Sequence, residues 1–252
     1  MFHTRWWQTT ERPSKQGTLF EGQIQHLVCL IGLLVGLYFA SNFPGFHDGS
    51  FLGLSTNKWV ILAVGGAIVH QVYVWICWRL ELNGRHLTHL FGDNAFHLFQ
   101  IGFAILIVLR PILAFVLGWS NRSTLAIELW ISYTLAVIIL IPAVYLVYCV
   151  RRYFGFERAF GIDHFDPSYH NIPLVEKGIF TWTPNAMYVF GFLILWVPAF
   201  LFQSVAALFV AMFSHVYIWV HYYCTEQPDM RRIYGWAIID KQSTYGPFRT
   251  FS

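Results

Sequence analysis

The residues from 187 to 223 form one long apolar stretch, and about forty residues in this part of the chain carry no formal charge. A transmembrane helix needs about 20 apolar residues, so this stretch is too long for a single crossing. It therefore predicts a helical hairpin that turns near residues 198–204. The polar segments at its two ends, which contain Asn185 and Glu226, would then return to the same face of the membrane and could build one site.

The rest of the chain also has the composition of a membrane protein. Of its residues, 56% are hydrophobic and 12% are charged, which is about half the charged fraction of a soluble domain. Aromatic residues make up 19%, as expected for belts at both membrane interfaces. The sequence predicts an all-α, polytopic membrane protein with about six transmembrane segments, the last two forming a hairpin. These segments cover residues 24–43, 58–80, 96–119, 127–150, 187–201 and 204–223.

The fifth segment is short for a full crossing, so it is expected to be tilted or to reach partway through the bilayer. We interpret residues 1–252 as a single membrane domain. Residues 1–150 would form an N-terminal four-helix part. Residues 151–252 would supply a cytoplasmic loop, the hairpin and a C-terminal tail that carry the site.

The Lys and Arg residues are distributed unequally between the two faces of these segments. With the N-terminus inside, thirteen of the sixteen lie on the cytoplasmic side, whereas Lys58 and Arg122 lie opposite and Arg110 lies within the third segment. Because positive charge is enriched in cytoplasmic loops, both termini are predicted to be cytoplasmic. The host membrane would be a bacterial inner membrane or the endoplasmic reticulum.

Two short motifs flank the hairpin. They are Asn185-Ala186-Met187-Tyr188-Val189-Phe190-Gly191, and Glu226-Gln227-Pro228 followed by Ile233-Tyr234. With Gly178-Ile179-Phe180 before them, they resemble the phospholipid methyltransferases. These enzymes and the isoprenylcysteine carboxyl methyltransferases form a wider group of integral-membrane methyltransferases that use S-adenosylmethionine. The similarity covers about residues 175–234.

The motifs depart from those of the phosphatidylethanolamine N-methyltransferase branch, which look like Asn-Pro-Met-Tyr-x-Gly and Glu-Glu-Pro followed by Ile-Tyr. Ala186 replaces the proline, Gly191 lies one residue further from the tyrosine, and Gln227 replaces the second glutamate. The Arg-His-Pro triplet typical of the carboxyl methyltransferase branch is replaced by residues 183–185.

The resemblance implies S-adenosylmethionine as cofactor and assigns Tyr188, Gly191 and Glu226 to it, with Asn185 and Gln227 as further members. The chemistry of these residues is compatible with that assignment. Glu226 can accept hydrogen bonds from hydroxyl or ammonium groups, and Gly191 would let the backbone approach a ligand closely.

Two further features could contribute to such a site. Free backbone N–H groups at residues 185–188 could bind the cofactor's carboxylate, and Trp182 and Tyr188 could supply ring faces. Alternatively, Glu226 and its neighbours simply end a helix at the interface, and Tyr188 is a residue of the aromatic belt.

Methyl transfer from a sulfonium requires that donor and acceptor are positioned and that water is excluded. An interfacial site suits an amphiphilic acceptor whose tail stays in lipid, and the resemblance favours a phospholipid amine. An amine must be neutral to attack, so a base is needed. His221 is the first candidate and His170 the second, although an interfacial histidine can also serve only as a hydrogen-bonded belt residue. No nucleic acid is expected as a partner.

Other polar residues allow further interpretations. His86, His89, Asp93 and His97 follow each other at steps of three and four residues, a spacing that could bind a metal, a lipid phosphate or only water. Gly84 and Gly92 argue against one unbroken helix there. His70 and Gln71 are predicted to make hydrogen bonds between helices.

Arg110 is costly in hydrocarbon unless it is paired or hydrated. It could pair with Glu128 or Asp93, line a polar cavity, or lie near a helix end.

Three alternatives to this function stay open from the sequence. Within the methyltransferases, the acceptor could be an isoprenylcysteine carboxyl group or a small thiol. A metal- or haem-dependent oxidoreductase or isomerase could use the histidines instead. The chain could also be a scaffold or transporter that binds no cofactor.

Overall fold

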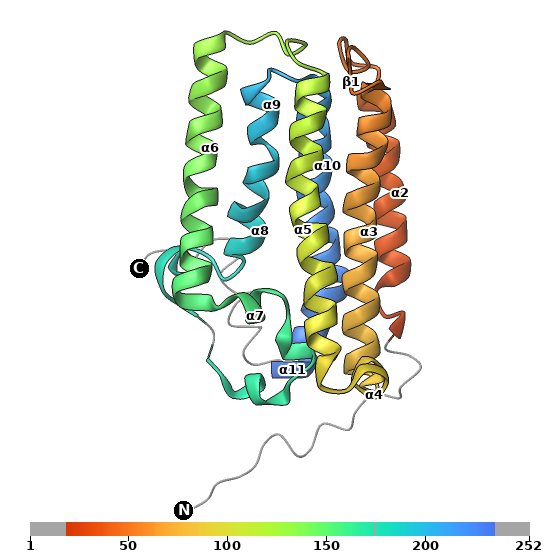
Figure 1. The fold of residues 1–252 in the computed structure, drawn as a ribbon, viewed down its shortest axis with the longest axis vertical. Coiled ribbons are helices and arrows are strands. Elements are labelled where there is room, and N and C mark those ends of the chain that lie inside the picture. The colour runs from red at the N-terminus through yellow and green to blue at the C-terminus, as the bar shows by residue number, and fades with distance from the viewer. Residues whose placement is uncertain (1–18, 174, 235–252) are drawn as a thin grey trace, which may run out of the picture.

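In the computed structural model, which describes residues 19–173 and 175–234, long helices run side by side along one axis of the molecule (Figure 1). The predicted location of the two chain termini falls outside the described residues. The long helices are α2 (Gln23–Ala40), α3 (Thr56–Leu82), α5 (Ala95–Ser120), α6 (Leu129–Cys149) and α10 (Val205–His221).

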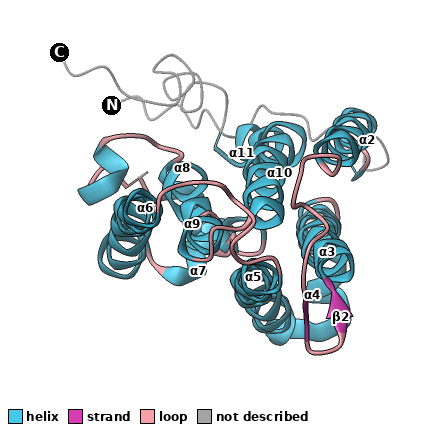
Figure 2. Ribbon diagram, turned by 90° about the horizontal axis from the view of Figure 1, so that it is seen from above, coloured by secondary structure: helices cyan, strands magenta, loops and turns pink. Residues whose placement is uncertain are grey.

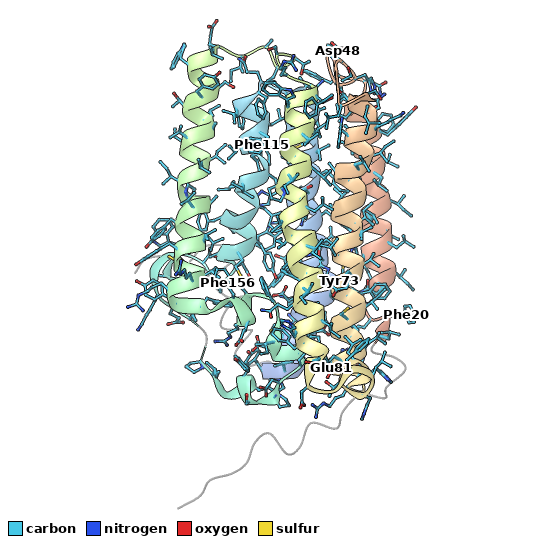
Figure 3. The ribbon with its side chains drawn as sticks, in the orientation of Figure 1. Phe20, Asp48, Tyr73, Glu81, Phe115 and Phe156 are labelled. Atoms are coloured by element: carbon cyan, nitrogen blue, oxygen red, sulfur yellow. The ribbon has the colours of Figure 1, made fainter. Side chains whose placement is uncertain are left out.

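Among the described residues, five helical stretches are long and apolar enough to cross a membrane: Gln23–Ala40, Thr56–Leu82, His86–Ser120, Leu129–Phe154 and Val205–Tyr234. Helices are the expected solution, because a helix satisfies its backbone hydrogen bonds internally where no water is present. Large apolar side chains such as Phe115 project from the bundle, whereas Asp48 and Glu81 lie near its two ends (Figure 3). The chain is therefore an all-α, polytopic membrane protein, as predicted.

The short elements gather at the two ends of the bundle (Figure 1). At one end, which we call the far end, β1 (Ser50–Phe51) and β2 (Leu54–Ser55) form a small antiparallel hairpin. The opposite end, which we call the site end, carries most of the other short elements. These are α4 (His86–Phe91), η2 (Gly92–Asn94), η3 (Val150–Phe154), α7 (Phe156–Ala159), η4 (Ile162–His164), η5 (Pro167–Asn171), η6 (Gly178–Thr181) and α11 (Gln227–Tyr234).

The apolar stretch forms the predicted hairpin. Its first arm consists of α8 (Ala186–Phe190), the 3₁₀ segment η7 (Gly191–Leu195) and α9 (Val197–Leu201). The chain turns after α9 and returns as α10, whose first turn is capped because the Ser204 hydroxyl accepts a hydrogen bond of 3.1 Å from the Ala207 N–H. The turn lies within the predicted residues 198–204.

The first arm, Ala186–Leu201, is shorter than the other spans. A 3₁₀ helix rises about 2.0 Å per residue, against about 1.5 Å for an α-helix, so η7 extends the reach of this arm. The short length predicted from the sequence is thus present, and it is partly offset by the local geometry.

Small residues let the helices pack closely. Helices α5 and α10 lie between the pair α2 and α3 on one side and α6, α8 and α9 on the other (Figures 1 and 2). Ala67, Ala199 and Ala206 are fully buried in the core. A Cβ atom on Gly118 would lie 3.0 Å from the carbonyl oxygen of Pro198, so glycine permits the contact between α5 and α9. This packing by small residues is typical of helices in membranes.

Candidate functional site

A cavity enters the bundle from the site end between the two groups of helices. It contains about 1120 Å³ of space between side chains, including its open mouth. Its walls come from α3, α5, α6, α7, α8, η7 and α10 with their adjoining turns. Most of the lining is apolar, for example Phe103, Ile107 and Ile218. Ligand sites generally combine such an apolar wall with a few polar groups.

Tyr188 and Glu226 meet in the wall of this cavity. Tyr188 lies on α8, and its hydroxyl donates a hydrogen bond to Oε2 of Glu226, 38 residues later in the chain. The Tyr188 ring also packs against Trp219 and Tyr222, with centroid distances of 5.8 and 5.3 Å. A carboxylate thus lies beside a cluster of aromatic rings at the place where the two hairpin arms return to the site end.

The backbone around Glu226 is a π-helical turn. η8 (Tyr222–Glu226) follows α10 directly and leads into α11. A second π turn, η3, ends α6 on the other side of the cavity, where Val150 lines the wall. Single π turns often occur at functional sites, because the extra residue changes the direction of the side chains that follow it.

Tyr222 links both predicted motifs. Its hydroxyl lies near the side chains of Asn185 and Gln227. Neither Asn185 nor Gln227 is among the residues that line the cavity. The sequence grouped Tyr222 with the apolar stretch and gave no signal for this role.

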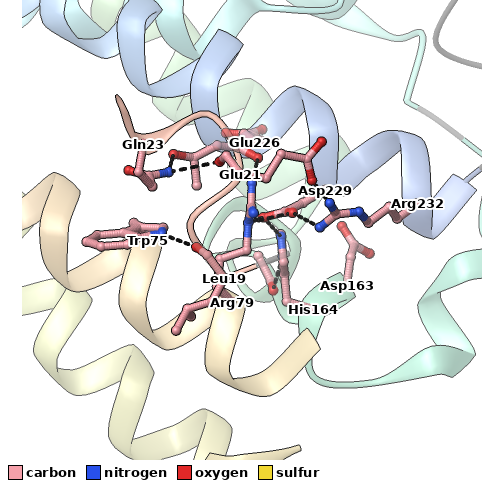
Figure 4. Close-up of polar contacts among 12 residues, drawn as sticks. Leu19, Glu21, Gln23, Trp75, Arg79, Asp163, His164, Glu226, Asp229 and Arg232 are labelled. Carbon is pink, nitrogen blue, oxygen red and sulfur yellow. Dashed lines mark hydrogen bonds and ion pairs between the residues drawn. The ribbon is translucent and has the colours of Figure 1, made fainter. Parts of the chain in front are cut away.

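A buried ion pair supports the site from below (Figure 4). Nε of Arg79, on α3, lies 2.7 Å from Oδ1 of Asp229, on α11, and both side chains are fully buried. Arg79 also donates a hydrogen bond of 3.3 Å to the carbonyl oxygen of Thr225, the residue before Glu226. The pair therefore fixes the backbone that presents Glu226 to the cavity.

Further charged groups surround Asp229. Arg232 lies 3.4 Å from its carboxylate and forms an ion pair with Glu21 (Figure 4). Nε2 of His164 lies 3.7 Å from Asp229, and the His164 ring stacks on Trp78 at a centroid distance of 4.1 Å. The segment before α2, the loop after α6 and the end of α11 are thus joined beneath the cavity.

The loop between α6 and α8 is held by its own polar contacts. Arg158 donates hydrogen bonds of 3.1 and 2.9 Å to the carbonyl oxygens of Ile172 and Pro173. Tyr169 donates a hydrogen bond of 2.9 Å to Glu157, and this bond raises the pKa of the Tyr169 hydroxyl above its ordinary value. These contacts shape the floor of the site end rather than the cavity wall.

His221 is the last residue of α10 and lines the cavity. Its side chain is 2% exposed, and neither ring nitrogen has a hydrogen-bond partner within the described chain. His170, the second candidate base, lies in η5, where Nε2 is 2.8 Å from the carbonyl oxygen of Asp163. It is outside the cavity wall, so the geometry separates the two histidines that the sequence considered together.

The eight candidate residues do not all come together. Tyr188, Gly191, His221 and Glu226 line one cavity. Trp182 lies apart from it, 44% exposed and packed on Phe190 with a centroid distance of 5.9 Å. The turns of η6 and α8 direct it away from the cavity, which the sequence spacing could not reveal.

Two details of the predicted cofactor contacts differ from expectation. The Asn185 N–H donates a hydrogen bond of 3.1 Å to the Thr183 hydroxyl and the Tyr188 N–H donates one of 3.0 Å to the Asn185 carbonyl, so neither is free for a ligand. A Cβ on Gly191 would come within 3.0 Å of Leu146 on α6. The glycine therefore serves helix packing as well as the cavity wall.

The polar residues within the long helices also behave differently from the prediction. Both ring nitrogens of His70 and the amide nitrogen of Gln71 lack hydrogen-bond partners among the described residues, so the predicted bonds between helices are wrong. Of the three alternatives for Arg110, the structure selects the cavity. Arg110 lines the cavity within α5, away from the helix ends, and both terminal nitrogens of its guanidinium lack a partner among the described residues.

The histidines near α4 do not form a compact centre. α4 ends at Phe91 and η2 separates it from α5, as the two glycines suggested. Across residues 19–173 and 175–234, no group of three or more His, Cys, Asp or Glu side chains is arranged to hold a metal ion.

A comparison with protein families identifies the region that contains this geometry. The sequence model for phospholipid methyltransferases matches residues 131–237. This region resembles a phospholipid methyltransferase. The match extends from α6 to the end of α11, so it includes both hairpin arms, the Tyr188–Glu226 pair and the Arg79 partner Asp229. It confirms the resemblance inferred from the two motifs.

The phospholipid methyltransferase match, together with the long apolar helices, supports an integral-membrane methyltransferase. No curated protein and no solved structure matches the chain. Helices α2, α3 and α5 lie outside the matched region, yet α3 and α5 supply much of the cavity wall.

Proposed function

We propose that this chain transfers a methyl group from S-adenosylmethionine to an amphiphilic acceptor, and that a phospholipid amine is the first acceptor to test. The observation that carries the proposal is the meeting of Tyr188 and Glu226, one from each motif, in the wall of a large cavity. Both residues lie within the region that matches the phospholipid methyltransferases.

The residues around this pair fit the chemical groups of the cofactor. Glu226 can accept hydrogen bonds from ribose hydroxyls or from an ammonium group. Tyr188 lines the cavity and offers an aromatic face for an adenine ring, and Trp219 and Tyr222 pack against its ring. When bound, S-adenosylmethionine supplies an electrophilic methyl group on a sulfonium.

The cavity suits an acceptor that stays partly in lipid. Phe156, at the site end, lines the cavity and is 47% exposed (Figure 3). The cavity therefore reaches the molecular surface at the level where the headgroup of an amphiphile would lie. Its apolar walls exclude water from the reacting groups, which favours transfer to the acceptor over hydrolysis.

We assign the proton transfer to His221. An amine acceptor must lose its proton before it attacks, and a base in the cavity wall can take that proton. Both ring nitrogens of His221 are without partners in the described structure, so one is available to accept a proton. We regard His170 as a loop residue instead, because its Nε2 is engaged by the Asp163 carbonyl.

We further propose that the site end faces the cytoplasm. Among the described residues, Arg79, Arg85, Arg158 and Arg232 belong to the site end, whereas Lys58 and Arg122 belong to the far end. This asymmetry agrees with the enrichment of positive charge in cytoplasmic loops. Thiol labelling of the single-cysteine variants Glu128→Cys and Glu157→Cys in intact cells tests this orientation. Labelling of Glu157→Cys from outside the cell would contradict it.

Binding of S-adenosylmethionine and S-adenosylhomocysteine to the purified protein in detergent is the first test. We expect Glu226→Gln to weaken both affinities by about tenfold to a hundredfold, since hydrogen bonds to charged groups contribute about 1.5–3 kcal/mol. Tyr188→Phe should have a smaller effect of the same sign. Glu128→Gln, an exposed carboxylate of the far end, is the matched control.

A folded wild-type protein that binds neither compound would refute the proposed function. If binding is found, vesicles containing phosphatidylethanolamine are compared with an isoprenylcysteine analogue and a long-chain thiol as methyl acceptors. Methylation of the thiol or the carboxyl compound alone would keep the enzyme class and replace the phospholipid amine.

A further inference from the structure

The inner part of the cavity contains a cation in an unusual position. Arg110 lies on α5 (Ala95–Ser120), about 22 Å from the site-end start of that helix and about 15 Å from its other end at 1.5 Å per residue. It is therefore within the membrane-spanning part of the bundle. A charged side chain there is costly and generally marks a functional site.

The surroundings of Arg110 do not neutralise it. Its side chain is 5% exposed, and both terminal nitrogens of the guanidinium lack a hydrogen-bond partner in the described part of the chain. The guanidinium packs over the ring of Phe192 at 4.7 Å from the centroid. That contact offers an aromatic face but no oxygen acceptor for the N–H groups.

Two residues of α3 line the cavity with Arg110. His70 and Gln71 are 3% and 2% exposed, and the ring nitrogens of the first and the amide nitrogen of the second have no partners within residues 19–173 and 175–234. These side chains and Arg110 come from two neighbouring helices and all line the same cavity. A buried polar group without a partner is expensive, so such a concentration needs an explanation.

The chemistry of these groups defines what would satisfy them. A guanidinium donates hydrogen bonds and never accepts them, and the Gln71 amide nitrogen is also a donor. The occupant must therefore present oxygen acceptors, and a negative charge would neutralise Arg110 in this apolar setting. A carboxylate matches the two parallel donors of a guanidinium especially well.

We propose that Arg110, His70 and Gln71 form an oxyanion-binding subsite at the inner end of the cavity, which takes the carboxylate of a ligand that enters from the site end. Side chains on a helix tilt toward its N-terminus, so the Arg110 guanidinium extends from α5 toward the cavity mouth. Arg110 lies about 22 Å along α5 from the site end, whereas Glu226 ends η8 at the site end, so the two residues mark opposite ends of the cavity wall.

The carboxylate could belong to either of two molecules. If the function proposed above holds, one source is the amino acid part of the cofactor. The other source is an acidic amphiphile that serves as methyl acceptor. Ser214 of α10 lines a small adjoining pocket together with Arg110, so it marks the depth of Arg110 on this helix. At about 1.5 Å per residue, Ser214 lies about 18 Å along the helix from Glu226. A ligand that reaches from Glu226 to Arg110 is therefore elongated.

The experiment compares two carboxylate ligands with partners that lack the carboxylate. The unfolding temperature of the purified protein is measured in a non-ionic detergent with each ligand. S-adenosylhomocysteine, which has a carboxylate, is compared with 5′-methylthioadenosine, which has none, and dodecanoate is compared with dodecanol. Wild type should bind the carboxylate member of at least one pair about tenfold more tightly, as expected for a charge-assisted hydrogen bond. Arg110→Gln should abolish that preference, and Arg110→Lys should keep part of it.

The pair that responds identifies the source of the carboxylate. A response to S-adenosylhomocysteine points to the cofactor, and a response to dodecanoate points to the acceptor. The comparison of dodecanoate with dodecanol needs no cofactor. It therefore tests whether the subsite binds a carboxylate even if the proposed methyltransferase function is wrong. Arg122→Gln, which removes an exposed cation of the far end, is the matched control and should leave both preferences unchanged.

The stability of the ligand-free protein gives an independent readout. If Arg110 serves a ligand, Arg110→Gln should unfold at the same temperature as wild type or at a higher one, because an unpaired buried cation has been removed. If its role is structural, the variant should unfold at a lower temperature. The proposal is overturned if wild type binds neither carboxylate, binds each no better than its neutral partner, or keeps the preference in the Arg110→Gln variant.

Discussion

Within the described residues, buried polar side chains have hydrogen-bond partners at the far end of the molecule, but several lack them in the cavity. At the far end, the fully buried Asn121 amide donates to the carbonyl oxygens of Gly45 and Asp48 at 2.7 and 2.8 Å. Its oxygen accepts from the Ser204 hydroxyl and the Ala206 N–H, both at 2.9 Å. In the cavity, His70, Arg110 and His221 have nitrogen atoms without partners among the described residues.

The presence or absence of hydrogen-bond partners distinguishes polar residues that stabilise the fold from those that we propose bind a ligand. Asn121 connects the loop after α2 with the hairpin turn, so its hydrogen bonds determine how three distant segments meet. These nitrogen atoms of the cavity groups make no hydrogen bonds within the described residues, although the side chains pack against rings such as Phe103 and Phe192. Burying such groups without hydrogen-bond partners is costly. A polar residue kept in such a place is best explained by a function that the protein fold alone does not require.

The site end contains a buried ion pair of its own, between Arg79 and Asp229, and breaking this pair should have the largest effect on stability. Asp229→Ala leaves the buried Arg79 without its carboxylate, and we expect a loss of about 3–5 kcal/mol in the free energy of unfolding. Equilibrium unfolding in mixed micelles measures it. Asp93→Ala, an exposed carboxylate of η2, should change stability little.

A double variant tests the cause of that loss. Arg79→Met combined with Asp229→Leu removes both charges, and replacing a buried pair by apolar groups is often neutral or stabilising. It should therefore recover most of the stability lost in Asp229→Ala. Because Arg79 also holds the Thr225 carbonyl, the double variant should still bind S-adenosylhomocysteine less tightly. A double variant as unstable as Asp229→Ala would refute this explanation.

The far-end cluster should give the next largest effect. Asn121→Ala leaves several buried donors and acceptors unpaired, and we expect a loss of about 2–4 kcal/mol in the free energy of unfolding. Ligand affinity of the folded fraction should be unchanged, because Asn121 lies at the opposite end from Glu226. Asn42→Ala, which removes exposed local hydrogen bonds to Tyr38 and Phe39, is the control. A change in ligand affinity would contradict the view that the far end stabilises the fold without contributing to ligand binding.

Much of the fold follows from the sequence because hydrophobic length is a local property. The hairpin and the return of Tyr188 and Glu226 to one end were predictable, since apolar length fixes how many times the chain crosses. The motifs then identified the residues of the two arms that meet. The match to residues 131–237 supports the family that these motifs suggested.

The pairings between distant residues could not be read from the sequence. Arg79 and Asp229 are 150 residues apart, and nothing local marks them as partners. His70 and Gln71 were expected to bond neighbouring helices, but helix rotation turns them toward the cavity. The sequence suggests Trp182 as a ring face for the cofactor, whereas in the structure its side chain is exposed and lies outside the cavity wall. Rotation and packing decide such details, and both depend on the whole bundle.

His70→Leu should have the smallest effect on stability. It is the most sensitive test of the difference between the cavity and the far end. His70 is buried against Phe103, with a centroid distance of 4.9 Å, and its nitrogens make no hydrogen bonds within the described chain. Because replacing an unsatisfied polar group by an apolar one of similar size is nearly neutral or stabilising, the free energy of unfolding should stay equal or rise by up to about 1 kcal/mol. Asn121→Ala, in contrast, should lose stability.

The same substitution should weaken the binding of a carboxylate ligand severalfold while leaving its neutral partner unaffected. His97→Leu, a change at an exposed histidine of α5, provides the control for both measurements. A His70→Leu protein that is clearly destabilised would mean that His70 has a structural partner like those of Asn121. The cavity would then belong with the far end as part of the fold, and the distinction between the two regions would fail.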